Sequence, residues 1–327
     1  MSDLTGLLFA GAALILWSLS PFFFTGTGKR IGPFATNLLR LLFAFLALCA
    51  FCALRPVVGF HAPPPSLAAA LWLAASGVIG LTIGDAFLYQ AFVTVGPERT
   101  SQIQTLAPAA TAAIAWIALR EFLSPLQMLG MALILGGVLI ATTSAARSAH
   151  SAGSAAGDGT AAPGETGSGA SSAGSGRAPA RLLSGAWAAI WSALFQAIGT
   201  VLARKGFQAQ ADLDPILATT IRIGAGTIAL WAYARWKGPL RPALGHWTEP
   251  RTWRLMAAGV LFGPLVGMVC YVAALKFAPA GIVTTITFMA PLLIIPIGAK
   301  LYGTRITMAA LCGTALSLGG VVLLGLG

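Results

Sequence analysis

One acidic residue, Asp85, lies deep inside a long apolar stretch that reads GLTIGDAFLYQAF over residues 80–92. A carboxylate in the middle of a membrane helix costs about 2.5–3.5 kcal/mol on insertion scales, so such residues face a bundle interior or a cavity. The spacing of Thr82, Asp85 and Tyr89 places all three on one helical face. This stripe favours a site in which Asp85 takes up a proton or binds a cationic group. The competing interpretation is a packing acid paired with an arginine or a hydroxyl.

Two arginines, Arg40 and Arg222, stand at equivalent places about seven residues into two other apolar stretches. A long arginine side chain can extend to the membrane surface, which is a structural role. Its recurrence at one position also fits a counter-ion to an acid or a gate, and both interpretations stay open. The residue that matches Asp85 in the second half of the chain is Gly267. Any pairing between acid and arginine must therefore be asymmetric.

Two prolines, Pro108 and Pro291, fall inside apolar stretches, where each removes a backbone hydrogen bond and kinks a helix. Broken helices near the bilayer midplane are where transporters form binding sites. We expect polar side chains near these prolines to line a cavity; the alternative is hydrogen bonding between helices. These polar residues are Gln102, Gln104, Thr105, Thr284, Thr285 and Thr287. The remaining candidates for the cavity wall are Trp17, Tyr89, Gln196 and Tyr271.

The sequence lacks the patterns of a metal site, a cofactor site or an enzyme. Cys49 and Cys52 form a CxxC without the context of a redox motif, and the three histidines stand far apart. No HExxH, P-loop or nucleophile elbow occurs. We expect no cofactor, no metal and no enzyme activity. An ATP-driven pump would need a partner that supplies the nucleotide site.

The composition indicates that these residues are held by membrane-spanning helices. The 327 residues are 57% hydrophobic and only 9% charged, whereas soluble domains carry about 25% charged residues. A span of the hydrocarbon core needs about 20 apolar residues, and ten such stretches occur. They cover residues 4–24, 34–54, 67–93, 98–119, 125–143, 182–203, 215–234, 253–275, 281–299 and 306–326.

The ten stretches form two copies of one unit. PFATNLLR at 33–40 matches PILATTIR at 215–222, and LAASGV at 73–78 matches LMAAGV at 255–260 at the same offset. One inserted residue later, Pro108 pairs with Pro291. Because each copy has an odd number of helices, the second copy enters the membrane from the opposite side, as in many secondary transporters. The predicted fold is therefore an all-α integral membrane protein with ten transmembrane helices in two inverted five-helix repeats.

A segment of small residues separates the two copies. It includes SAGSAAGDGTAAPGETGSGASSAGSG and shows no apolar periodicity, which is typical of a flexible, disordered linker. The expected organisation is a first repeat over 1–143, a linker over 144–181 and a second repeat over 182–327.

Each repeat resembles the five-helix EamA unit of the drug/metabolite transporter superfamily. The resemblance rests on the second-helix arginine, on GPERTSQIQTLAP and FAPAGIVTTITFMAP leading to the proline, and on the ending QMLGMALILGGVLI. It implies a carrier in the bacterial inner membrane, with a cavity lined by the first, third and fourth helices of each repeat and a peripheral fifth helix. The family often has an acidic residue after the fourth helix; here Glu121 supplies it, but Thr304 takes the matching place.

We therefore expect a secondary transporter that exports small organic metabolites, amino acids or drugs by alternating access, either facilitatively or coupled to protons. The alternatives are an integral membrane enzyme and a non-transporting scaffold. The expected partners are a small-molecule substrate and the lipid bilayer. Nucleic acid is not expected, because the 20 lysines and arginines behind the net charge of +11 are scattered at helix ends and form no basic run. The charges favour a cytoplasmic linker, whereas the family resemblance favours cytoplasmic termini.

Overall fold

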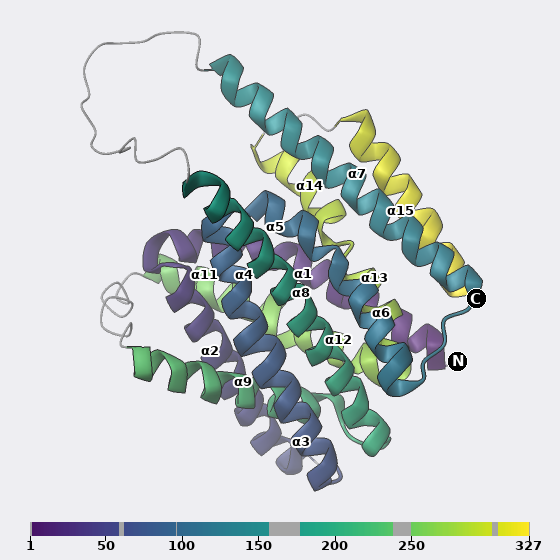
Figure 1. The fold of residues 1–327 in the computed structure, drawn as a ribbon. Helices are drawn as coiled ribbons and strands as arrows, with labels where there is room; N and C mark the ends of the chain where they lie inside the picture. Colours follow the sequence, from purple (N-terminus) through teal and green to yellow (C-terminus); the bar gives the residue numbers. More distant parts are fainter. Residues whose placement is uncertain are drawn as a thin grey trace.

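The computed structural model describes residues 2–58, 62–95, 97–156, 177–237, 250–302 and 307–326. In these ranges the chain forms a bundle of helices without strands (Figure 1). Nine of the described helical segments are long and apolar enough to cross a membrane, and a shorter apolar helix covers Ala280–Ile294. The predicted fold class, an all-α membrane protein with two five-helix repeats, is confirmed.

Within the described residues, the first repeat contains nine helical elements, and its third and fourth spans are each divided. In chain order they are α1 (Ser2–Ile31), α2 (Pro33–Leu54), the short 3₁₀ turn η1 (Arg55–Val58), α3 (Leu67–Ser76), the π-helix η2 (Gly77–Gly84), α4 (Asp85–Thr94), α5 (Pro97–Gln104), α6 (Leu106–Leu119) and α7 (Pro125–Ala156).

The described elements of the second repeat follow the same plan. They are α8 (Arg177–Ala209), α9 (Pro215–Lys237), α11 (Pro250–Val260), the π-helix η3 (Leu261–Leu265), α12 (Val266–Phe277), α13 (Ala280–Thr287), α14 (Ala290–Tyr302) and α15 (Met308–Leu326).

Two helices extend beyond the expected spans and into the predicted linker. The expectation of irregular chain over 144–181 is wrong at both ends, because α7 continues to Ala156 and α8 begins at Arg177. The reason lies in the alanines, which are the strongest helix formers and recur through ATTSAARSAHSAGSAA. The central residues 157–176 of the predicted linker lie outside the described ranges.

The fourth span of each repeat is broken at its proline, as predicted. α5 ends at Gln104 and α6 begins two residues later, so Pro108 lies in the first turn of α6. Pro291 likewise lies in the first turn of α14, after α13 has ended at Thr287. The first turn is where proline is tolerated, because those N–H groups have no partner inside the helix. Backbone N–H groups at the breaks bond locally, that of Thr105 to Gln102 and that of Met289 to Ile286.

The third span of each repeat contains a π-helical segment that the sequence pattern did not predict. η2 ends directly before Asp85, and η3 lies in the matching part of the second repeat around Pro264. Short π-helical segments widen a helix locally and occur often at functional sites. Here each one lies in the middle of a span, next to the interface between the two repeats.

Each repeat packs its third span against the first span of the other repeat. The segments α3, η2 and α4 contact α8, while α11, η3 and α12 contact α1. The matching helices α2 and α9, and α7 and α15, also contact one another, and α13 contacts α6. Glycines allow close approach at these crossings, since a Cβ on Gly199 would lie 2.9 Å from the Cα atom of Gly80. The pairing is that of two units related by a pseudo-twofold axis.

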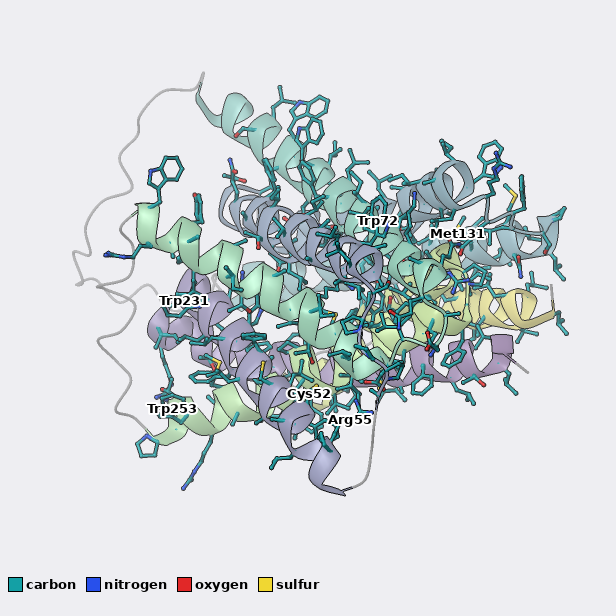
Figure 2. All side chains as sticks on the ribbon, turned by 90° about the horizontal axis from the view of Figure 1, so that it is seen from below. Cys52, Arg55, Trp72, Met131, Trp231 and Trp253 are labelled. Atoms are coloured by element: carbon teal, nitrogen blue, oxygen red, sulfur yellow. The ribbon has the colours of Figure 1, made fainter. Side chains whose placement is uncertain are left out.

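Aromatic side chains mark one end of the bundle. Figure 2 shows Trp231 on α9 and Trp253 on α11, toward the end of the bundle opposite Arg55. Trp236, five residues beyond Trp231, is 81% exposed, and Trp253 is 38% exposed. Tryptophan is enriched at membrane–water interfaces, so these residues fit the role of interface anchors. α7 and α15 lie together at one edge of the bundle (Figure 1), in agreement with a peripheral fifth span.

Candidate functional site: a charged cavity between the repeats

A cavity of about 240 Å³ with charged and polar side chains in its wall lies where the two repeats meet. Its walls come from the first, second, third and fourth spans of both repeats, and the charged residues among them are two arginines and one aspartate. The wall residues that bear on its chemistry are Trp17, Ser20, Arg40, Asp85, Gln196, Thr200, Arg222, Gly263, Tyr271, Thr284 and Thr287.

Asp85 is paired with Arg40. The Nη2 atom of Arg40 donates to the Asp85 carboxylate over 2.9 Å, and its Nε atom donates to the side-chain oxygen of Asn37 over 2.7 Å. The guanidinium also lies over the ring of Phe24, 5.6 Å from its centroid. Asp85 is only 6% exposed, so this arginine supplies the opposite charge that a buried carboxylate requires. The pair joins the second and third spans of one repeat.

Arg222 is the second cationic residue in the cavity wall, and it is bonded differently. It is 4% exposed, and two of its nitrogens, Nε and Nη1, have no hydrogen-bond partner within the described part of the chain. Its guanidinium lies 5.6 Å from the ring centroid of Tyr271. The cavity wall therefore carries one arginine that is paired with an acid and one whose donors are not all used.

Two aromatic rings form another part of the wall. Trp17 from α1 and Tyr271 from α12 lie with ring centroids 5.0 Å apart and planes tilted by 35°. The indole N–H of Trp17 donates to the backbone oxygen of Gly263 over 3.3 Å, and the Tyr271 hydroxyl shares a 2.7 Å hydrogen bond with Thr200. Gly263 belongs to the π-helical segment η3, which positions this carbonyl group beside the cavity. The two rings are thus fixed at their polar ends.

Eight of the residues singled out from the sequence lie together around this cavity. Asp85 and both arginines are among them, although the Arg40 and Arg222 positions are far apart along the chain. The eight are Trp17, Arg40, Asp85, Gln196, Arg222, Tyr271, Thr284 and Thr287. Thr284 and Thr287 contribute little free polarity, because each hydroxyl donates to a backbone oxygen of α13.

Six other candidates are not among the residues that line this cavity: Gln102, Gln104, Thr105, Thr285, Pro108 and Pro291. Pro108 and Pro291 lie in the first turn of the helix that follows each break. The Thr105 hydroxyl lies inside one break and donates to the Gln102 backbone oxygen over 2.6 Å. Gln104 is 7% exposed and donates to Ser192 on α8 over 2.8 Å. This is the hydrogen bonding between helices that was the alternative interpretation. Thr285, also considered from the sequence, is fully buried and bonds to Gly281.

The predicted polar stripe does not survive as one face. The Thr82 hydroxyl donates to the Gly226 backbone oxygen on α9 over 2.9 Å, away from the ion pair that Asp85 makes. The wider turn of η2 changes the angular step that the prediction assumed. Tyr89 lies in α4, but its side chain falls outside what the structure describes.

Sequence reasoning missed several residues of the wall. Ser20 and Thr200 both line the cavity. Asn37 does not line the cavity, but it accepts a hydrogen bond from Arg40 and so orients that side chain. One signal was available for Asn37, because it stands three residues before Arg40 and so shares its helical face. Ser20 and Thr200 stand alone in apolar surroundings and carry no comparable signal.

A cluster of charges joins the two repeats beyond one end of the cavity. The Nε atom of Arg204 donates to Glu121 over 2.6 Å, and its Nη1 atom donates to the backbone oxygens of Leu275 and Lys276 over 2.7 and 2.9 Å. The second Glu121 oxygen accepts from the backbone N–H of Ala280 over 2.9 Å. Arg204 thus satisfies the C-terminal end of α12, and Glu121 satisfies the N-terminal end of α13. Glu121 belongs to the first repeat, whereas its two partners, Arg204 and Ala280, belong to the second.

This cluster lies one helical turn from the cavity. Arg204 follows Thr200 by four residues in α8, and Leu275 follows Tyr271 by four residues in α12. Four residues correspond to about one turn, or about 6 Å along the axis. Both Thr200 and Tyr271 line the cavity. The Arg204–Glu121 ion pair therefore holds the two repeats together just beyond the cavity, toward the end of the bundle where α6 and α8 finish.

A second ion pair joins the repeats at the same end. Arg55 donates to both carboxylate oxygens of Asp214, over 2.6 and 3.3 Å, and Asp214 also accepts from the backbone N–H of Leu217 at the start of α9. The hydrogen bond with Asp214 raises the pKa of Arg55 above its already high usual value. A cationic group whose pKa is raised by folding stabilises the protein fully at every pH below the pKa that the group has in the unfolded chain. This stabilisation is lost only in strong alkali. Arg55 therefore stays charged under all ordinary conditions.

A larger hollow of about 400 Å³ lies between α6 and α7, but it is a weaker candidate. Its walls are mostly alanine, methionine and aromatic side chains, including the 56% exposed Trp116 and the 75% exposed Phe122. Glu121 borders this hollow and is already paired with Arg204. An apolar, outward-facing hollow is suited to lipid chains rather than to a polar solute.

The chain is similar to known proteins in sequence and in fold. The model of the EamA-like transporter family matches residues 4–143 and 183–326. No curated protein matches. One solved crystal structure aligns over 100% of this chain and 99% of its own length, with a TM-score of 0.71 and 17% sequence identity. At that identity the likeness shows the fold alone.

Proposed function

The chain belongs to the EamA-like transporter family and is a multi-pass membrane transporter, and from this membership and the cavity we propose that it is a secondary transporter. It moves small organic solutes by alternating access, in the direction of export, in a bacterial inner membrane. It is not an enzyme. The solutes come from the range of metabolites, amino acids and drugs, and they bind in the cavity between the repeats.

One observation carries this proposal: the charged cavity lies on the interface between two inverted repeats. Residues of both repeats form its walls, with Asp85 and Arg40 from the first and Arg222 and Tyr271 from the second. Relative movement of the repeats would therefore change access to the cavity without dismantling either repeat. Ionisable residues inside a membrane bundle are expensive and commonly mark a substrate or ion pathway.

The ion pairs define what must change during a transport cycle. In the present conformation, Arg204–Glu121 and Arg55–Asp214 join the repeats at one end of the bundle. Opening the cavity toward that end requires at least the first of these pairs to separate. The cluster that Glu121 makes is thus proposed to act as a gate that closes this end.

Asp85 is the proposed coupling residue. It is the acid in the described cavity wall, and Arg40 is its counter-ion. Proton uptake by Asp85 would remove the attraction to Arg40 and free the arginine, so protonation and the arrangement of the second and third spans would be linked. Facilitative transport without protons is the alternative.

Transport can be tested with a mixture of candidate solutes. Purified protein is reconstituted into liposomes loaded with a small-molecule extract of bacterial cells, and the solutes released into the medium are identified by mass spectrometry. We expect selective loss of a few solutes compared with protein-free liposomes. Conversion of a solute into a new compound would support the enzyme alternative, and unchanged contents would support a scaffold. A proton-sensitive dye inside the liposomes reports whether release moves protons.

A further inference from the structure

We propose that Arg222 binds the anionic group of the transported solute, and that the substrates are compact organic acids carrying a carboxylate. The inference rests on the proposed function, and it specifies the chemical class of solute that this cavity takes. It replaces the expectation that Asp85 binds a cationic group.

The bonding of Arg222 is the main reason. An arginine that is 4% exposed normally satisfies its donors, because a buried charge without partners costs several kcal/mol. Yet the Nε and Nη1 atoms of Arg222 find no acceptor among the described residues. A cation kept in that condition at a cavity wall is prepared for a partner that arrives from outside the chain. A carboxylate suits it well, since guanidinium N–H groups match carboxylate oxygens in geometry.

The charges of the cavity favour an anion over a cation. Two guanidinium groups and one carboxylate line it, which gives a formal charge of +1. The carboxylate of Asp85 is already engaged by Arg40 over 2.9 Å. A cationic solute would have to displace Arg40 and would meet Arg222 as well. A solute with one negative charge would instead bring the cavity to neutrality, which a low-dielectric interior favours.

The remaining wall limits the size and shape of the acid. The cavity of about 240 Å³ is comparable to about eight water molecules at about 30 Å³ each. The Tyr271 ring lies beneath the Arg222 guanidinium and beside the Trp17 indole. A carboxylate held by Arg222 would therefore place the rest of the solute near an aromatic surface. This arrangement suits a small acid with an apolar or aromatic body.

Two variants distinguish a binding arginine from a structural one. Arg222→Met keeps much of the length of the side chain but removes a buried charge that lacks hydrogen-bond partners, so we expect the melting temperature of the purified protein to rise. Arg40→Met is the matched control at the repeat-related position. It leaves the buried Asp85 without its counter-ion, so its melting temperature should fall. A fall for Arg222→Met as large as that for Arg40→Met would overturn the proposal.

Binding is measured with three probes that share one ring and differ in charge: benzoate, benzamide and benzylamine. We expect benzoate to raise the melting temperature of the wild-type protein at lower concentration than the other two. Its apparent affinity should drop by about tenfold or more in Arg222→Met and should be partly kept in Arg222→Lys. Equal stabilisation by all three probes, or unchanged benzoate binding in Arg222→Met, contradicts an anion site.

The liposome assay separates this proposal from the proposed function. Release restricted to carboxylic acids, and lost in Arg222→Met, supports both. Release of amines or neutral solutes alone overturns the anion site but leaves the transporter intact. If nothing is released while benzoate still stabilises the wild type and not Arg222→Met, transport fails and the anion site stands.

Discussion

The indole of Trp17 lies directly against Gly267, the residue that corresponds to Asp85 in the second repeat. A Cβ atom on Gly267 would come within 2.6 Å of Trp17 Cδ1 and Nε1 and within 2.5 Å of the Phe262 backbone oxygen. The second repeat thus has no space for a side chain where the first carries its acid. The cavity is asymmetric because one repeat contributes a carboxylate and the other receives an aromatic ring.

The first prediction follows from this contact. Gly267→Ala should lower the free energy of unfolding by about 1–3 kcal/mol, because the added methyl group must displace the indole or bend the helix. It should also weaken solute binding, since the indole lines the cavity. Denaturation in detergent and the liposome assay measure the two effects.

Gly319→Ala in α15 is the control for that prediction. An added Cβ atom there meets nothing within 4 Å, so the protein should be unchanged or slightly more stable. Similar stability of the Gly267→Ala and Gly319→Ala variants would mean that the Trp17 contact is not restrictive.

The second prediction concerns proton coupling. Asp85→Asn keeps the shape of the side chain but cannot change its charge with pH. If Asp85 couples transport to protons, the initial rate should lose its dependence on pH and on an imposed proton gradient. Rates are measured from pH 5.5 to 8.5 in liposomes, with the Asp212→Asn variant as a control, because Asp212 is exposed and lies outside the cavity. A pH profile that persists in Asp85→Asn excludes this residue as the proton carrier.

The third prediction concerns the gate. Glu121→Gln removes the charge that pairs with Arg204, so the cavity should open more readily toward that end of the bundle. A cysteine placed at Thr200, in a chain whose native cysteines are replaced, should react several-fold faster with a membrane-impermeant maleimide once Glu121→Gln is added. The reagent is applied from each side of the membrane in turn. Asp212→Asn in place of Glu121→Gln should leave the rate unchanged, and equal rates in both backgrounds would rule out this gate.

The fourth prediction separates the two tasks of Asp214. Asp214→Asn loses the ion pair with Arg55 but keeps an oxygen that can accept from Leu217, whereas Asp214→Ala loses both. The alanine variant should therefore be less stable than the asparagine variant by about 1 kcal/mol, the usual value of a helix cap. Thermal unfolding of both variants in one detergent measures the difference. If the two unfold together, the cap contributes nothing at this end.

The number and order of the helices could be read from the sequence because each span has to satisfy a simple condition. About 20 apolar residues must cross the hydrocarbon core, and only a helix satisfies their backbone there. The breaks at Pro108 and Pro291 were predictable for another local reason, because proline lacks the N–H group that a continuous helix needs. The extension of α7 to Ala156 was not predicted, because the polar and small composition of that segment outweighed its many alanines.

The candidate site could be predicted only in part. Asp85, Arg40 and Arg222 stood out because charge inside a membrane has to be explained by a local function. The pairing of Asp85 with Arg40 and not with Arg222 depends on how two distant spans cross, which no local pattern records. The π-helical turn before Asp85 turned Thr82 toward α9, so an argument from helical spacing failed at that point. The hydrogen bond from Gln104 to Ser192 likewise depends on how two distant spans pack, which no local pattern records.

The cluster around Glu121 determines how dissolved salt acts on one end of the protein. The sequence places Thr304 where a second copy of this acid would stand, so the carboxylate belongs to one mouth of the carrier and not to the other. Dissolved salt screens charges in water that are more than about 8 Å apart at physiological ionic strength, and it screens partly buried pairs much less. The Arg204 and Glu121 side chains are only 18% and 11% exposed and their charged atoms lie 2.6 Å apart, so salt should leave the closed pair nearly unchanged. Once the pair has separated, both charges face water, and a high salt concentration in the compartment that this mouth faces should slow its closing rather than hasten its opening.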